Sequence, residues 1–250
     1  MIRGLDIFRD YFSDFQEQYV IIGGAACDIV FYDSDSSFRA TKDIDMVLIV
    51  EALTPEFGQR FWDFISAGRY ENKAKSSGVP QFYRFDKPKA PGFPHMIELF
   101  ARSESVFDRS RYECRPLHFG EEISSLSAIL LNADYYQLLL SGRDIMSGLS
   151  ILPITHLILF KAKAWLDLTE RKSLGQNISE RDIRKHKNDV ARLTALLTGR
   201  ESIAVPLSVF DDMAKFVEAF EKEPLDIKSL NIPGVTSGDI VGVLKSIYHI

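Results

Sequence analysis

One segment constrains this chain more than any other: residues 19–50, which read YVIIGGAACDIVFYDSDSSFRATKDIDMVLIV. A short apolar run over 19–22 ends at Gly23-Gly24, a pattern typical of a buried strand that enters a tight turn. The residues after the glycines are typical of a helix, and DIDMVLIV over 43–50 is the clearest strand in the sequence. The segment therefore predicts a strand, a turn, a helix and a second strand in close succession.

The pattern changes near residue 150, from mixed helix and strand signals to helix signals alone. Before that point the spacing of apolar residues predicts helices over 6–18 and 57–65 and strands over 80–86, 95–101 and 127–132. After it, helices are predicted over 155–172, 179–198, 206–222 and 237–248. The sequence predicts an α+β fold, with a mixed-sheet domain over residues 1–150 and a helical domain over residues 151–250.

Composition excludes several classes of protein. The chain has 250 residues, of which 46% are hydrophobic, so it is long and apolar enough to bury a core and is not a disordered chain. No apolar run reaches about 18 residues, which argues against a membrane span. Two cysteines are too few for a disulfide framework or a zinc site, and a cytoplasmic location is expected. The net charge of −5 argues against broad coating of duplex nucleic acid.

Asp43 and Asp45 stand two residues apart in the clearest strand. Side chains alternate between the faces of a strand, so both carboxylates point the same way. Two neighbouring carboxylates repel each other, and a bound cation offsets that repulsion. Oxygen ligands with few other protein ligands nearby suit Mg²⁺, which completes its shell with water and substrate phosphate. The alternative is a polar strand edge where both carboxylates are solvated.

Gly23 and Gly24 are the second candidate feature. A strand that ends in two glycines and opens a helix exposes backbone N–H groups at the helix N-terminus, an arrangement that suits a phosphate. Glycine also allows the backbone to approach a ligand closely. The alternative is a tight strand-to-helix turn without a ligand.

Glu98 is a third candidate carboxylate, in the apolar strand HMIELFA. It shares a strand face with Met96 and Phe100, where an unpaired acid is unusual. Glu98 therefore meets either a cation or a nearby arginine such as Arg39 or Arg102.

Taken together, these residues resemble a known family. A glycine pair before a helix, followed by R-x-T-x-D-I-D leading into a strand, is similar to the DNA-polymerase-β-like nucleotidyltransferase superfamily, and within it to the AbiEii/AbiGii toxin-type nucleotidyltransferases. The later segments LILFKAKAWLDLTERK and SERDIRKHKNDVARL resemble that family's lysine-containing helix and the helix after it. The resemblance spans residues 19–197 and is carried first by Gly23, Gly24, Ala26, Arg39, Thr41, Asp43 and Asp45.

The resemblance implies a polymerase-β-like fold and an enzyme that moves a nucleoside monophosphate from an NTP such as ATP to an acceptor hydroxyl and releases pyrophosphate. It implies Mg²⁺ as cofactor, with Mn²⁺ as a substitute, and a toxin role with a cognate antitoxin and an RNA 3′ end as acceptor. The implied metal ligands are Asp43, Asp45 and Glu98, which also carry catalysis together with Lys161. The implied nucleotide-binding residues are Gly23, Gly24, Arg39, Thr41, Lys161, Lys185 and Asp189.

Alternatives remain open at this point. Lys161 lies on an apolar helix stripe, and its ammonium either reaches the triphosphate or snorkels to water along a packed stem. The acceptor is either RNA or a small molecule of the aminoglycoside type. A non-catalytic nucleotide- or partner-binding protein on the same fold is the remaining alternative, against which the intact D-x-D pair argues.

Overall fold

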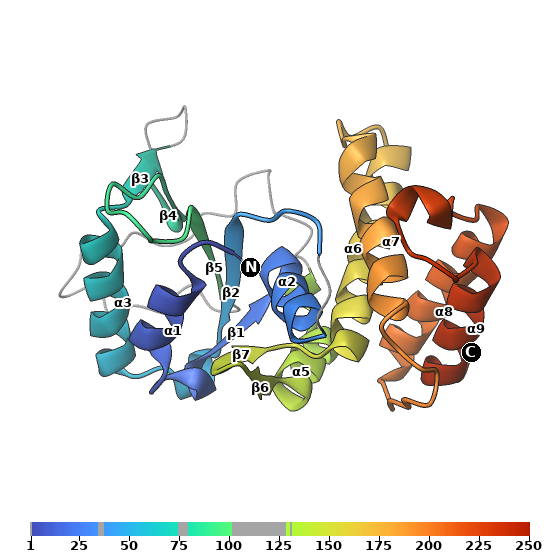
Figure 1. The fold of residues 1–250 in the computed structure, drawn as a ribbon, viewed down its shortest axis with the longest axis horizontal. Helices are drawn as coiled ribbons and strands as arrows, with labels where there is room; N and C mark the ends of the chain where they lie inside the picture. Colours follow the sequence, from blue (N-terminus) through green and yellow to red (C-terminus); the bar gives the residue numbers. More distant parts are fainter. Residues whose placement is uncertain (1, 35–37, 75–79, 102–128, 131) are drawn as a thin grey trace. The chain divides into compact units, whose positions relative to one another are not determined.

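A computed structural model describes residues 2–34, 38–74, 80–101, 129–130 and 132–250 of the chain (Figure 1). The chain forms two compact units, Met1–Ile123 with Gly142–Pro153, and Ser124–Ser141 with Ile154–Ile250. The first unit carries a mixed sheet with flanking helices, and the second is helical. The predicted α+β fold class is therefore confirmed.

The first unit is built on one sheet, which has seven strands in the described residues, in the order β3-β4-β5-β2-β1-β7-β6. The strands are β1 (Tyr19–Ile22), β2 (Asp43–Leu48), β3 (Glu71–Ala74), β4 (Pro80–Asp86), β5 (Met96–Ala101), β6 (Asp144–Met146) and β7 (Leu149–Ile151). The helices of this unit are α1 (Leu5–Phe12), α2 (Gly23–Asp33) and α3 (Pro55–Gly68), with 3₁₀ turns η1 (Gln16–Gln18) and η2 (Val50–Ala52).

Helices α1 and α3 cover one face of the sheet (Figure 1), and aromatic side chains from both helices pack against its strands. The ring of Phe8 on α1 stands edge-on to Tyr19 on β1, with 5.8 Å between the ring centroids. On the same face Phe61 of α3 stands edge-on to Phe85 of β4, at 5.5 Å. Such pairs add to the burial of apolar area, so this face is a closed core.

The opposite face of the sheet carries helix α2 and the acidic residues of β2. Alternation along β2 turns Met46 and Leu48 toward the aromatic core and Asp43 and Asp45 away from it. Helix α2 follows β1 directly, and its N-cap residue, Ile22, has no side chain that could accept a hydrogen bond from the first turn. The sheet therefore presents its acidic residues on the face where a helix begins without a side-chain cap.

The second unit is a bundle of helices. They are α5 (Ala133–Gly142), α6 (Ile154–Ser173), α7 (Glu180–Thr194), α8 (Leu207–Lys222) and α9 (Ser237–Tyr248), with the 3₁₀ turn η3 (Ile227–Leu230). The ends of these helices follow from their sequences. Ser179 caps α7 by accepting a hydrogen bond from the Arg181 N–H, and Thr236 and Asp239 form a capping box at α9.

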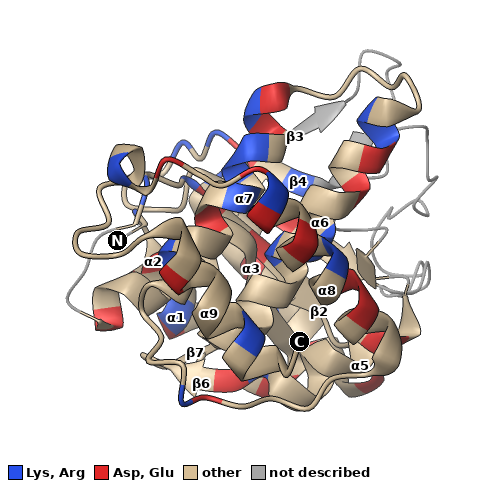
Figure 2. Cartoon of the chain, turned by 90° about the vertical axis from the view of Figure 1, so that its right-hand side faces the viewer, with Lys and Arg blue, Asp and Glu red and all other residues tan. Residues whose placement is uncertain are grey.

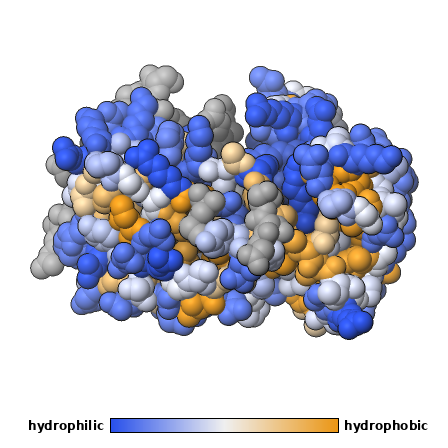
Figure 3. Space-filling model, viewed as in Figure 1, coloured by the Kyte–Doolittle hydropathy of each residue, from blue (hydrophilic) through white to orange (hydrophobic). Residues whose placement is uncertain are grey.

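Apolar faces of these helices pack on one another at the centre of the bundle. Trp165 of α6 stands edge-on to Phe216 of α8, with 5.4 Å between the ring centroids. Some apolar surface stays exposed over α8 and α9 (Figure 3), and Leu207 at the start of α8 is 74% exposed. No helix in the described part of the chain is long and apolar enough to cross a membrane.

Two segments differ from the sequence expectations. Residues 129–130 are helical, where a strand was predicted over 127–132. The division into units also differs from a single cut at residue 150: α5 lies in the helical unit, while the hairpin of β6 and β7 belongs to the sheet unit. The reasons are specific contacts, since Tyr135 of α5 packs edge-on against Phe160 of α6 and β7 pairs with β1 in parallel.

Candidate active site

The first glycine of the pair is required by its surroundings. Gly23 has a φ of 68°, in the left-handed region that side chains other than glycine rarely adopt. A Cβ atom at this position would lie 2.0 Å from Oδ2 of Asp45. The backbone at the start of α2 and the Asp45 carboxylate therefore stand in direct contact, which only glycine permits.

The second glycine makes room for the segment that leads into β2. A Cβ atom on Gly24 would lie 2.6 Å from Oγ1 of Thr41 and 3.8 Å from Nη2 of Arg39. Arg39 is held in turn by an aromatic contact, because its guanidinium lies 4.9 Å from the centre of the Phe38 ring. That ring packs on Phe31 of α2, with 5.1 Å between centroids. The structure thus brings together the glycines, Thr41 and Arg39, four of the predicted nucleotide-binding residues.

The three predicted carboxylates share one face of the sheet. Strands β2 and β5 are parallel, with Asp45 opposite Glu98 and Asp43 opposite Met96. Directly opposite residues on neighbouring strands point to the same face, so Glu98 lies on the face of Asp43 and Asp45. Asp43, Asp45 and Glu98 are each partly exposed to solvent. One row across the sheet consists of Ile22, Asp45, Glu98 and Arg84.

Glu98 forms an ion pair with Arg84, its register partner on β4. The Arg84 Nε and Nη2 atoms both contact Oε1 of Glu98. The sequence had suggested Arg39 or Arg102 as partners: Arg39 lies at the start of α2, and Arg102 lies outside the described residues. Arg84 was missed because its position opposite Glu98 depends on the register of β4 and β5, which the local pattern does not contain.

The donor set can be tested against the implied Mg²⁺. Among the described residues, no group of three or more His, Cys, Asp and Glu side chains stands ready to hold a metal ion. Two oxygen-donating aspartates on one strand face, beside backbone N–H groups at the start of α2, do fit an ion that takes its remaining ligands from water and substrate phosphate. Because Glu98 is paired with Arg84, Asp43 and Asp45 are the two carboxylates that fit the ion.

Three predicted site residues lie on helices α6 and α7 of the second unit. The Lys161 ammonium lies 3.0 Å from Oδ2 of Asp189, and the two side chains are only 7% and 0% exposed. Arg192 approaches the other oxygen of Asp189 at 3.7 Å. Lys185 is exposed on α7. Lys161 and Asp189 therefore form a buried ion pair. The Lys161 ammonium does not extend to water along its packed stem.

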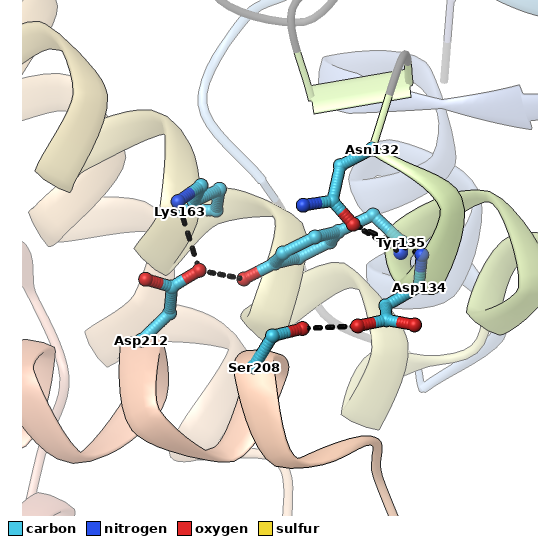
Figure 4. A network of polar contacts seen from close by, with 6 residues as sticks. All are labelled: Asn132, Asp134, Tyr135, Lys163, Ser208 and Asp212. Carbon is cyan, nitrogen blue, oxygen red and sulfur yellow. Dashed lines mark hydrogen bonds and ion pairs between the residues drawn. The ribbon is translucent and has the colours of Figure 1, made fainter.

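A second polar cluster in the helical unit joins α5, α6 and α8 (Figure 4). Asp212 accepts a hydrogen bond from the Tyr135 hydroxyl at 3.2 Å and pairs with Lys163 at 2.8 Å. Ser208 donates to Asp134 at 2.5 Å. Burial, and then the nearby Asp212 charge, raise the pKa of Tyr135 well above its usual value. These contacts link α5 to α8 directly and connect both helices to α6.

No family model matches the chain, and no curated protein matches it. Among solved structures, it is similar to an antigenic nucleotidyltransferase-like protein from Paracoccidioides brasiliensis, at 17% identity and a TM-score of 0.46, covering 92% of this chain and 94% of that one. A likeness at this level identifies no family and no activity for this chain.

Proposed function

We propose that this chain is a Mg²⁺-dependent nucleotidyltransferase, which moves a nucleoside monophosphate from an NTP to an acceptor hydroxyl. The observation that carries the proposal is the contact between Asp45 and Gly23, which joins a carboxylate to a helix N-terminus without a side-chain cap. An N-terminus of this kind attracts phosphate, and a carboxylate beside it attracts a cation. An NTP bound to Mg²⁺ carries both groups.

Each residue then has a role in binding the triphosphate. The backbone N–H groups at the start of α2 donate to phosphate oxygens, and the Arg39 guanidinium adds a positive charge on the same side. Thr41 supplies a hydroxyl that donates to the same oxygens. Asp43 and Asp45 hold the Mg²⁺, as the family resemblance implies. When bound, the ion neutralises charge on the triphosphate and orients its oxygens.

The reaction itself is a displacement at the α-phosphorus. The acceptor oxygen forms a bond to this atom while the bond to the leaving pyrophosphate breaks, and the hydroxyl proton is released. In this proposal Glu98, which lies next to Asp45 on the same face, accepts that proton after its carboxylate has separated from Arg84. A base that takes the proton typically contributes about a hundredfold or more to the rate.

The acceptor in this proposal is an RNA 3′ end, and one observation favours it over an aminoglycoside. Over residues 171–192 six Lys and Arg residues are at least partly exposed, against two Asp and Glu, within a chain whose net charge is −5. Figure 2 shows both basic and acidic segments on α7. A basic surface attracts the phosphates of RNA and repels a polycationic aminoglycoside. The toxin role and the antitoxin partner rest on the sequence resemblance.

The test is transfer of label from each α-labelled NTP, in Mg²⁺, to total tRNA or to an aminoglycoside. We expect labelled tRNA with the wild type and none with Asp43→Asn. Asp63→Asn is the matched control, because it makes the same change at an exposed site on α3 and should keep full activity. Label on the aminoglycoside alone would overturn the RNA acceptor. An active Asp43→Asn variant would overturn the metal-site assignment.

A further inference from the structure

The side chain of Glu98 stands between two neighbours of opposite charge. Asp45 is its register partner on β2, on one side, and Arg84 is its register partner on β4, on the other. In the structure Glu98 pairs with Arg84, on the strand away from the aspartates. Glu98 is thus engaged elsewhere while the aspartate pair stands at the start of α2.

We propose that Arg84 competes with the divalent cation for Glu98, so that this third carboxylate joins the metal site only when it leaves Arg84. The proposal rests on the proposed function, which places the cation at Asp43 and Asp45. It adds a positioning residue, Arg84, which controls the ligand set without touching the cation. Neither the family resemblance nor the motif residues include Arg84.

Charge balance explains why such a residue is useful. Without a cation, Asp43, Asp45 and Glu98 would place three negative charges on one face of the sheet, and these repel one another. Arg84 offsets the charge of Glu98 in that state. When a divalent cation binds, it supplies two positive charges to the same face, and Glu98 is then attracted from both sides.

The exchange is energetically easy because the ion pair is exposed. The Arg84 side chain is 50% exposed and that of Glu98 is 21% exposed, so water screens their attraction. Released from Glu98, the guanidinium reaches water directly. While Glu98 is paired with Arg84, it is not available to the cation. The apparent affinity for the cation is therefore reduced in proportion to the fraction of molecules in which Glu98 is free of Arg84. Loss of the pair should therefore strengthen cation binding by a modest factor.

The experiment measures Mn²⁺ binding to the full chain, without NTP, from the amplitude of the free-ion signal in electron paramagnetic resonance. Four proteins form a cycle: the wild type, Arg84→Gln, Glu98→Gln and the double variant. Arg84→Lys keeps the positive charge. Lys89→Gln removes a positive charge from another exposed ion pair of the same unit, with Glu71, and is the control for long-range charge. Thermal melts without metal check that each variant folds.

We expect Arg84→Gln to tighten Mn²⁺ binding about threefold to fivefold, the size expected when a weak exposed pair is lost. In the Glu98→Gln background the same change should give no more than the gain seen with Lys89→Gln. Arg84→Lys should bind like the wild type. An equal gain in both backgrounds, no gain, or weaker binding in Arg84→Gln would overturn the competition.

One further variant separates this proposal from the proposed function. If Asp43→Asn abolishes Mn²⁺ binding but Arg84→Gln leaves it unchanged, the metal site stands and the competition with Arg84 falls. If the wild type itself binds no Mn²⁺, or binds it as well as Asp43→Asn does, both proposals fall.

Discussion

The candidate site residues of the two units differ in how far they are exposed to solvent and in how their charges are paired. In the helical unit the pair of Lys161 and Asp189 is buried and closed, with each group supplying the charge the other needs. In the sheet unit Asp43, Asp45 and Glu98 share one partly exposed face, and the arginine that pairs with Glu98 is half exposed.

A buried ion pair and a partly exposed group of carboxylates contribute to a protein in different ways. Burying a charge is costly unless a partner compensates it, so removing one partner of a buried pair leaves an uncompensated charge, which is strongly destabilising. A partly exposed group of like charges gains little for the fold, but it can accept a cation without first being extracted from a core. We therefore propose the ligand site on the sheet face, whereas the Lys161–Asp189 pair contributes to the stability of the helical unit.

The largest effect should come from Gly23→Ala. The added Cβ would lie 2.0 Å from the Asp45 carboxylate, so that carboxylate must move, and activity should fall at least about a hundredfold. Gly175→Ala is the matched control, because Gly175 has a similar φ of 85° but nothing within 4 Å of its would-be Cβ. The control should show only the cost of backbone strain in a thermal melt. Equal activities of the two variants would contradict a site at Gly23.

Within the helical unit, Lys161→Met should reduce the free energy of unfolding by about 3–5 kcal/mol, because Asp189 would remain buried without its closest cation. Urea unfolding measures this loss. The double variant Lys161→Met with Asp189→Leu should lose less than the two single variants added together. A Lys161→Met protein with unchanged stability and weakened NTP binding would instead support the direct contact with the triphosphate that the sequence resemblance implies.

A smaller effect should appear as a pH dependence of stability. Burial lowers the pKa of His156 from 6.5 to about 4. His156 therefore becomes protonated near pH 6.5 in the unfolded chain but only near pH 4 in the folded chain. Stability present above pH 6.5 should be lost as the pH falls toward 4, by about 3 kcal/mol.

Urea unfolding at pH 7, 5.5 and 4.5 tests this dependence. In His156→Gln the same fall in pH should cost less, since glutamine does not titrate. Parallel pH profiles for the wild type and the variant would show that His156 contributes nothing to it.

The smallest effect concerns Lys187 of α7. Its ammonium donates to the backbone carbonyl of Glu223 at 2.7 Å and lies 5.4 Å and 5.3 Å from the ring centres of Trp165 and Phe220. Burial lowers the pKa of Lys187, which limits the net gain from these contacts. Lys187→Met should therefore reduce the stability of the chain by about 1–2 kcal/mol in urea unfolding.

The exposed Lys185 on the same helix provides the control, and Lys185→Met should change stability by no more than about 0.5 kcal/mol. Equal losses of stability at the two positions would show that the contacts of Lys187 with the carbonyl and the two rings do not stabilise the fold.

Local patterns made part of the site predictable. The strand before Gly23-Gly24 and the D-x-D strand follow from apolar alternation and glycine placement within about 30 residues, and the structure places them as β1 and β2. Strand alternation also placed Asp43 and Asp45 on one face, and it needed no knowledge of the rest of the sheet. These features depend on neighbours along the chain.

Other features depend on partners distant in sequence. Arg84 meets Glu98 through the antiparallel register of two strands, and Asp189 meets Lys161 through the packing of two helices. The helical residues 129–130 lie in an apolar stretch too short for its period to separate strand from helix. Tertiary contacts decide these cases, so the local sequence pattern could not predict them.

Thermal melts of the wild type, Asp43→Asn and Asp45→Asn test whether Asp43 and Asp45 bind a divalent cation together with an NTP. A ligand stabilises only the state that binds it. We expect the wild type to gain melting temperature when Mg²⁺ is added with NTP, and neither variant to do so. Without metal the Asp43→Asn variant should be at least as stable as the wild type, because one of two like charges is gone. A wild type without a metal-dependent shift, or variants with the same shift, would contradict that binding.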